Sequence, residues 1–142
     1  MLTYMLDTNI CIYVLKNYPQ ALRDRFNALA EQLCISCITL GELHYGAEKS
    51  ARRADNLSAI DNFVARLDVL PFEAKAAAHY GQLRAELERA GTPCGPHDMQ
   101  IGGHARSEGL IVVTNNLREF GRMPGLRVEN WVRVSLDRAQ LS

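Results

Sequence analysis

The chain has 142 residues, of which 47% are hydrophobic and 23% charged, and its 16 basic residues balance its 16 acidic ones. This is the size and composition of one globular domain, which argues against a disordered or fibrous protein. The zero net charge lacks the strong basic excess typical of general nucleic-acid binders, and no apolar run reaches the roughly 18–20 residues that span a bilayer.

The start of the chain predicts a cytoplasmic protein. Residues 1–7 lack the basic region that opens a secretory signal peptide, and an acid follows too soon. We therefore expect no membrane association. In that compartment we also expect the four cysteines to be reduced thiols.

The first third of the chain alternates strand and helix signals. Residues 2–6 are a short apolar run that predicts a buried strand, and polar capping residues lead from it into a helix through 10–15. A second helix, with Pro19 in its first turn, is expected to run to about Ala30. Residues 33–36 predict the second strand, and a helical pattern follows to about Ala51.

The middle of the chain repeats this alternation. Residues 54–67 have the spacing of one amphipathic helix face, and 69–70 predict a brief strand. Residues 73–90 are rich in Ala, Leu, Glu and Arg, which favours helix. A Gly- and Pro-rich loop at 91–96 separates it from a helix at 98–107, which Gly109 would end as a C-cap.

The last third contains the clearest strand. Residues 110–114 are an unbroken apolar run of the kind found in parallel sheets buried on both faces. A final short strand is expected at 126–129. Strands separated by helices require crossover connections, so the order predicts one α/β domain with helices on both faces of a parallel sheet.

Polar residues follow the predicted strands at the edge of the sheet where α/β sites lie. Asp7 follows the first strand, Glu42 lies in the first turns of the helix after the second, and Asp98 lies in the first turn of its helix. The last strand ends at Thr114. The fourth candidate acidic position is filled by Asn116 or Glu119.

Such a cluster predicts a metal-dependent phosphodiesterase. Neighbouring carboxylates repel, so some must be protonated or share a cation. Oxygen ligands favour Mg²⁺ or Mn²⁺, and a two-ion site could hydrolyse phosphodiesters. Each acid also has a structural explanation: Asp7 can cap a helix, and Glu42 and Asp98 can lie near helix N-termini simply because the dipole favours them. Spacing alone leaves both interpretations open.

Four segments together resemble the successive motifs of the PIN-domain family. They are residues 5–9 (MLDTN), 36–43 (SCITLGEL), 96–101 (PHDMQI) and 113–120 (VTNNLREF). Within that family the chain resembles enterobacterial VapC toxins, to which 45–50 (YGAEKS), 84–87 (RAEL) and 91–93 (GTP) add support. The resemblance implies a three-layer α/β/α sandwich with a mainly parallel sheet of four to five strands. The PIN domain would cover residues 1–132, with a C-terminal tail at 133–142.

The resemblance also implies roles for the acids. Asp7 and Asp98 would bind Mg²⁺ or Mn²⁺ directly, and Glu42 would assist and position the attacking water. Many family members carry Asp where this chain has Asn116, and Glu119, one turn onward, could replace it, which leaves the number of metals open. The residues expected to hold and orient these groups are Thr8, Asn9 and Thr114.

The activity implied is that of an endoribonuclease toxin that cuts structured RNA, with the anticodon region of initiator tRNA as the substrate. A VapB-type antitoxin would inhibit it, and the chain would form a homodimer or a hetero-oligomer with that antitoxin. The candidate phosphate contacts are Lys49, Arg52, Arg118 and Arg122. Such charged runs are also typical of solvated surfaces.

Three other functions remain as alternatives. A catalytically weak PIN-like module could bind RNA without cutting it. The C-x-x-C of Cys34 and Cys37 could be a redox pair or half a zinc site, although it begins inside an apolar strand, where two small buried hydrophobes are the simpler explanation. A phospho-aspartyl enzyme would want a second Asp where Asn9 stands.

Two further features are expected to be structural. His97, next to Asp98, is expected to be a surface imidazole, although it could contact phosphate or act as a general acid. Gly102 and Gly103 lower the helix propensity of their segment, so they either permit close packing or leave that helix mobile.

Overall fold

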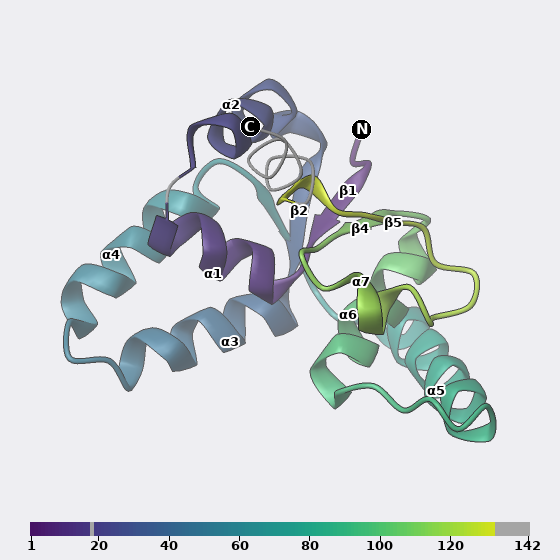
Figure 1. Ribbon diagram of the computed structural model, residues 1–142. Helices are drawn as coiled ribbons and strands as arrows, with labels where there is room; N and C mark the ends of the chain where they lie inside the picture. Colours follow the sequence, from purple (N-terminus) through teal and green to yellow (C-terminus); the bar gives the residue numbers. More distant parts are fainter. Residues whose placement is uncertain (18, 133–142) are drawn as a thin grey trace, which may run out of the picture.

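The computed structural model describes residues 1–17 and 19–132, so the predicted tail at 133–142 lies outside the described residues. Strands and helices alternate along the chain as expected (Figure 1). The strands are β1 (Tyr4–Leu6), β2 (Leu33–Ser36), β3 (Asp68–Leu70), β4 (Ile111–Val113) and β5 (Val128–Glu129). The helices are α1 (Thr8–Asn17), α2 (Gln20–Ala28), α3 (Cys37–Glu48), α4 (Arg53–Val64), α5 (Ala74–Arg89), α6 (Pro96–Glu108) and α7 (Leu117–Phe120), with a 3₁₀ turn at Ala30–Gln32.

All five strands are parallel, in the order β3-β2-β1-β4-β5. The first strand of the chain is therefore the central one, and it pairs with β2 on one side and with β4 on the other. In the register, Leu6 lies beside Val113 at the carboxyl ends of β1 and β4. The residues that follow these two strands therefore emerge next to each other.

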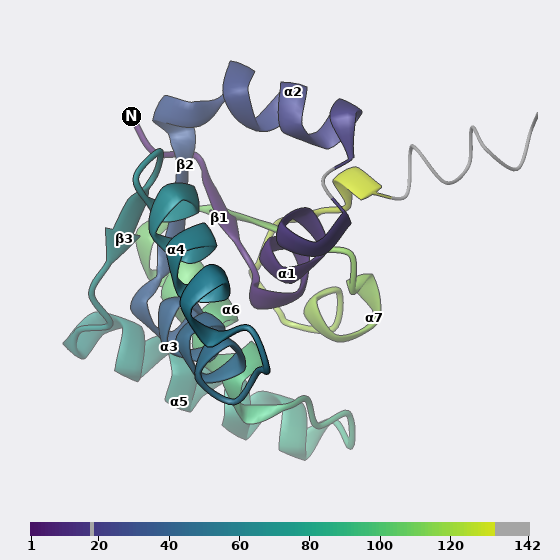
Figure 2. The same ribbon diagram turned by 90° about the vertical axis from the view of Figure 1, so that its left-hand side faces the viewer.

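Helices cover both faces of the sheet, which confirms the predicted three-layer sandwich (Figure 2). Successive residues of a strand point to opposite faces. Leu6 and Val113 accordingly join a core with α1, α2, α3 and α4, whereas Met5 and Val112 join a core with α5, α6 and α7. None of the helices among the described residues is long and apolar enough to cross a membrane.

Several elements differ from the sequence prediction, three of them near the site or at a proline. The four-residue helix α7 was not expected, because so short a segment shows no periodicity. Helix α6 begins at Pro96, two residues early, with proline in the first turn where its missing N–H is not needed. Pro19, expected inside the second helix, is instead its N-cap, and α2 ends at Ala28.

The two adjacent glycines of α6 permit close packing, the first of the two predicted explanations. A Cβ atom on Gly103 would lie 2.7 Å from the backbone nitrogen of Tyr80 in α5. A Cβ on Gly102 would overlap the sulfur of Met123. Real side chains do not approach this closely, so the glycines set the position of the helix that carries Asp98.

Candidate active site

Asp7 is fully buried at the carboxyl end of β1, where it joins two elements. Its Oδ1 accepts a 2.8 Å hydrogen bond from the backbone N–H of Ile10, so the side chain caps α1. Its Oδ2 accepts a 2.6 Å bond from the hydroxyl of Thr114, which follows β4. Burial raises the pKa of Asp7 to about 6, against the lowering effect of these two bonds, and the charge of Glu42 raises it further.

Glu42 lies on α3, one turn beyond the buried Thr39. Its Oε1 accepts a 2.7 Å hydrogen bond from the hydroxyl of Thr8, which also lies 3.2 Å from the hydroxyl of Thr39. Its Oε2 lies 2.8 Å from Nδ1 of His97. His97 is 60% exposed but is a direct partner of Glu42, so it is more than the surface imidazole expected. Both oxygens of Glu42 are therefore fixed in direction.

Asp98, in the first turn of α6, pairs with Glu119 on α7. Burial and a hydrogen bond to Glu119, with the negative charges of Glu119, Asp7 and Glu42, raise the pKa of Asp98 to about 8. A hydrogen bond between two carboxyl groups requires a proton on one of them. Asn116 contributes its backbone N–H, which donates to Thr114 at 2.8 Å. Of the two candidates for the fourth position, it is Glu119 that contacts another acid.

A groove of about 460 Å³ opens beside these acids, between α1, α3 and α4. Glu42 and Asp98 lie at its acidic end, and the exposed Asn9 lines its wall. Lys49, the C-cap of α3, lines the same groove. A second groove, of about 270 Å³ between α2 and α4, contains none of the acids.

The other three candidate phosphate contacts lie outside this groove. Arg52 donates to Asp55 at 2.8 Å and is 78% exposed. Arg118 and Arg122 lie on and just after α7, on either side of Glu119 in the sequence. Two separate basic positions thus flank the acids: Lys49 in the groove, and the arginines at α7.

The acids fit a divalent cation by their chemistry. Asp98 feels the charges of Asp7, Glu42 and Glu119, so a single proton or cation lowers the repulsion among all four. The donors are oxygen atoms, which suit a hard divalent cation. Among residues 1–17 and 19–132, no group of three Asp, Glu, His or Cys side chains is close enough together to hold a metal ion. A proton shared by Asp98 and Glu119 reduces their repulsion, and a bound cation would have to displace that proton.

The cysteines are packed inside the two cores or beside them. All four are free thiols, and Cys34 points into the core beneath α5 and α6. Burial raises the pKa of Cys34 to about 12, which suppresses the thiolate that redox chemistry and zinc binding require. The thiol of Cys37 accepts a hydrogen bond from the backbone N–H of Phe72 at 3.3 Å. These environments favour the structural explanation for the C-x-x-C.

Two contacts of the candidate site were not predicted from the sequence. Thr39 precedes Glu42 by three residues on one helix, and this spacing could have identified it as a neighbour. The contact between His97 and Glu42 joins residues 55 positions apart, and its only signal was that His97 precedes Asp98.

Comparison with known proteins confirms the resemblance expected from the four motifs. The PIN-domain family model matches residues 4–126. The chain is 59% identical to the tRNA(fMet)-specific endonuclease VapC of Shigella flexneri and 57% identical to the protein of that name from Salmonella typhimurium, in each case over 92% of this chain and 99% of the relative.

A solved structure gives the same result for the fold. The crystal structure of DNA-bound VapBC from Salmonella typhimurium contains a chain that matches with a TM-score of 0.91 and 57% identity, covering 92% of this chain and 99% of that one. PIN-domain nucleases generally use a divalent metal, in agreement with the oxygen donors gathered here. The chain therefore belongs to the PIN-domain family, and within it to the VapC proteins.

Proposed function

We propose that this protein is a divalent-metal-dependent endoribonuclease, the toxin of a toxin–antitoxin pair, and that it cuts initiator tRNA in the anticodon region. The observation that carries the proposal is that acids from four separate segments influence one another: Glu42 raises the pKa of Asp7, and Glu119, Asp7 and Glu42 raise that of Asp98. Burial and mutual repulsion raise the pKa values of Asp7 and Asp98, as expected of acids arranged for a cation. The relatives' names supply the substrate.

Asp7 and Asp98 are the proposed metal ligands, and Glu119 is the proposed additional acid. Mg²⁺ or Mn²⁺ bound there would neutralise the acids, polarise the scissile phosphate and lower the pKa of an attacking water. Thr114 fixes Asp7 Oδ2 in direction, as a supporting hydrogen bond does for a metal ligand. Asn116 supports the same position through its backbone N–H.

Glu42 is the proposed acceptor of the water's proton. The hydroxyl of Thr8 holds Oε1, and His97 contacts Oε2 on the exposed side, so the carboxylate faces the groove in a fixed orientation. His97 can then pass the accepted proton to solvent, because its ring contacts Oε2 and is 60% exposed. Asn9 lines the wall next to Thr8, where it would orient the RNA backbone.

A single-stranded loop is the form of RNA that suits this groove. Glu42 and Asp98 lie at one end of the groove of about 460 Å³, and Lys49 lines the same wall as Glu42. Loops present splayed bases and accessible phosphates, whereas a stiff duplex does not enter such a groove. Arg118 and Arg122 are proposed to hold the backbone on the α7 side. Arg52 is a weaker candidate, because Asp55 already binds it.

A VapB-type antitoxin is the proposed partner, since a related chain was solved in a VapBC complex. An enzyme that acts on tRNA would work in the cytoplasm, which is the location we propose. The pairing is tested by co-expressing this chain with the VapB protein of the Salmonella complex. Growth is expected to recover and the two proteins to copurify. Continued growth arrest without copurification would reject this cross-pairing.

The activity is tested with antitoxin-free protein and purified bacterial tRNA, in Mg²⁺, in Mn²⁺ and in EDTA. Discrete fragments are expected from one tRNA species, in metal only, and none with Asp98→Asn. Asp61→Asn, an exposed acid on α4, is the matched control and should cleave normally. Folded protein that binds tRNA in metal but never cleaves it would instead be the binding-only module.

A further inference from the structure

An exposed tyrosine lies in the groove beside the acids and has no role in the proposed chemistry. Tyr45 on α3 is 67% exposed, one of three large hydrophobic side chains exposed among the described residues. The other two are Met1 and Val69, and neither lines the groove. An aromatic ring left in water at the rim of a polar groove has a face available for a flat partner.

Tyr45 belongs to a stripe of α3 residues that line one wall of the groove. Glu42, Tyr45 and Lys49 are three and four positions apart, which places them on one face of the helix. From Glu42 to Lys49 the helix rises roughly 10 Å. The opposite wall is α1, which packs against α3 and carries Lys16 in its last turn (Figure 1). The groove is thus acidic at the sheet and basic at its far end.

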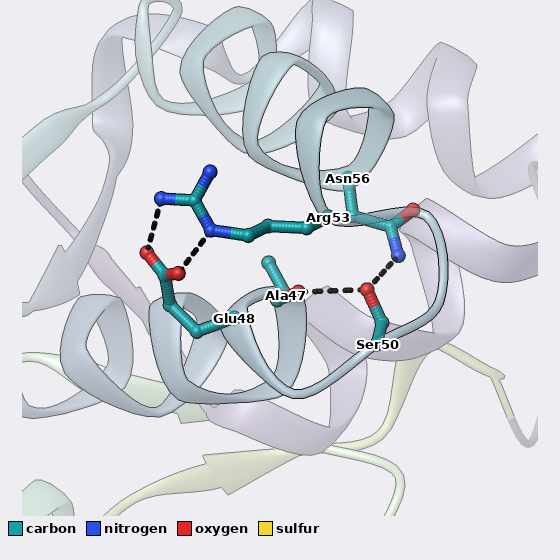
Figure 3. Close-up of polar contacts among 5 residues, drawn as sticks. All are labelled: Ala47, Glu48, Ser50, Arg53 and Asn56. Carbon is teal, nitrogen blue, oxygen red and sulfur yellow. Dashed lines mark hydrogen bonds and ion pairs between the residues drawn. The ribbon is translucent and has the colours of Figure 1, made fainter.

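Of the three basic residues at and after the end of α3, Lys49, Arg52 and Arg53, it is Lys49 that lines the groove. Arg53 is occupied by Glu48 through two hydrogen bonds, and Ser50 links the carbonyl of Ala47 to the side chain of Asn56 (Figure 3). These contacts fix the turn in place. Arg52 is bound by Asp55.

Lys49 itself forms no ion pair within residues 1–17 and 19–132. Its ammonium lies over the ring of Tyr45, 4.7 Å from the ring centroid, which orients both side chains. A positive charge held on one ring face, with most of the ring still exposed, is the pattern of single-stranded RNA sites. Such sites combine stacking on an aromatic ring with a cation near the backbone.

We propose that Tyr45 and Lys49 form a nucleobase-stacking subsite: the ring of Tyr45 stacks on a base next to the scissile phosphate, and Lys49 contacts the adjoining backbone phosphate. This deepens the proposed function and rests on it. Any base can stack on the ring, so the subsite would bind an unpaired loop of any sequence and place the RNA backbone over the acids. A protein partner covering Tyr45 is the competing explanation, which the acidic and basic ends of the same groove disfavour.

The first test uses Tyr45→Ala, Tyr45→Phe and Tyr45→Trp with purified initiator tRNA in Mn²⁺. Base–aromatic stacking corresponds to about a 5- to 150-fold effect, so kcat/KM should fall by that factor in the alanine variant. The phenylalanine and tryptophan variants should cleave like the wild type, because they keep a flat ring. Light scattering on each variant should give an unchanged oligomeric state.

A sharper test removes the base instead of the ring. RNA hairpins of the anticodon arm are made with an abasic nucleotide on either side of the mapped cut. At the stacked position, the abasic substitution and Tyr45→Ala should each slow cleavage, and together no more than either alone. Lys49→Met should lower the salt dependence of hairpin affinity in EDTA by about 0.7 in log–log slope. Lys75→Met, on α5 outside the groove, is the matched control and should not change it.

Several results would overturn the proposal. Normal cleavage by Tyr45→Ala, an equal loss in the phenylalanine and tryptophan variants, or fully additive effects with every abasic position would each exclude stacking. A changed oligomeric state with unchanged hairpin affinity would assign Tyr45 to a protein contact. If the wild type cuts no RNA, the proposed function fails. Hairpin affinity in EDTA then still decides whether Tyr45 stacks on a base.

Discussion

Replacing Asp7 by asparagine removes a buried negative charge and keeps the size of the side chain. Asp7 is fully buried, and burial raises its pKa from 3.8 to about 6. A carboxyl group whose pKa is higher in the folded chain binds more protons when folded. The free energy of unfolding of the metal-free protein therefore falls as pH rises from about 4 to about 6, and the loss is complete above that range.

The size of this loss follows from the pKa. One pKa unit corresponds to about 1.4 kcal/mol, so ionised Asp7 lowers the free energy of unfolding at pH 8 by about 3 kcal/mol. The asparagine side chain of the variant would avoid this loss. It has one acceptor oxygen where the carboxylate has two, so it keeps only one of the hydrogen bonds from Ile10 and Thr114, which removes about 1.5 kcal/mol. We expect Asp7→Asn to be about 1–2 kcal/mol more stable than the wild type at pH 8 without metal.

The assay is urea denaturation followed by circular dichroism, in EDTA, at pH 4 and pH 8. Subtracting the wild type at each pH cancels the titrating groups that do not feel the charge of Asp7. Asp98 does feel that charge, so the loss of this repulsion adds to the gain at pH 8. The gain should be present at pH 8 and absent at pH 4. Asp61→Asn, an exposed acid, is the control and should show no such difference. In Mn²⁺ at 100 times its Kd, the wild type should gain about 2.7 kcal/mol and Asp7→Asn little. Equal destabilisation of Asp7→Asn at both pH values would show that ionised Asp7 does not lower the stability of the folded chain.

Three further predictions concern the support of the site. Gly103→Ala should lower stability by about 1–3 kcal/mol, because its Cβ would meet the backbone of α5, whereas Gly81→Ala has open space and should gain up to about 1 kcal/mol in thermal denaturation. Thr114→Val removes the hydrogen bond that lowers the pKa of Asp7, so the pH profile of Mn²⁺-dependent cleavage should move to higher pH, with Thr114→Ser restoring it. Burial lowers the pKa of His104 from 6.5, so the unfolded chain binds more protons and stability falls in acid. His104→Gln should reduce that acid loss in urea titrations, and an unchanged pH dependence would contradict it.

The fold was predictable because its signals are local. The apolar run at 110–114 and the helical spacing around it depend on residues within a few positions of each other. Asp7 could be placed because a polar residue directly after a buried strand emerges at the sheet edge. Helix α7 was missed because four residues span little more than one turn and show no repeat.

The contacts within the site were less predictable, because they join segments far apart in the chain. Nothing in the sequence indicated that His97 would meet Glu42, or that Glu119 would be the acid that contacts Asp98. The basic residues at 49–53 could also not be told apart from the sequence alone. Only the structure separates Arg52, which has an acidic partner, from Lys49, which faces the groove.

The strand order has a consequence for how the toxin is synthesised. Asp7 is translated among the first residues, but its hydrogen-bond partner Thr114 comes 107 residues later. The central strand β1 therefore stays open on one side until β4 has left the ribosome. Chains that stop before β4 lack Thr114 and Glu119, so the carboxylate of Asp7 keeps only the bond from the backbone N–H of Ile10. The residues that surround Asp7 are therefore brought together only when synthesis of the chain is almost complete.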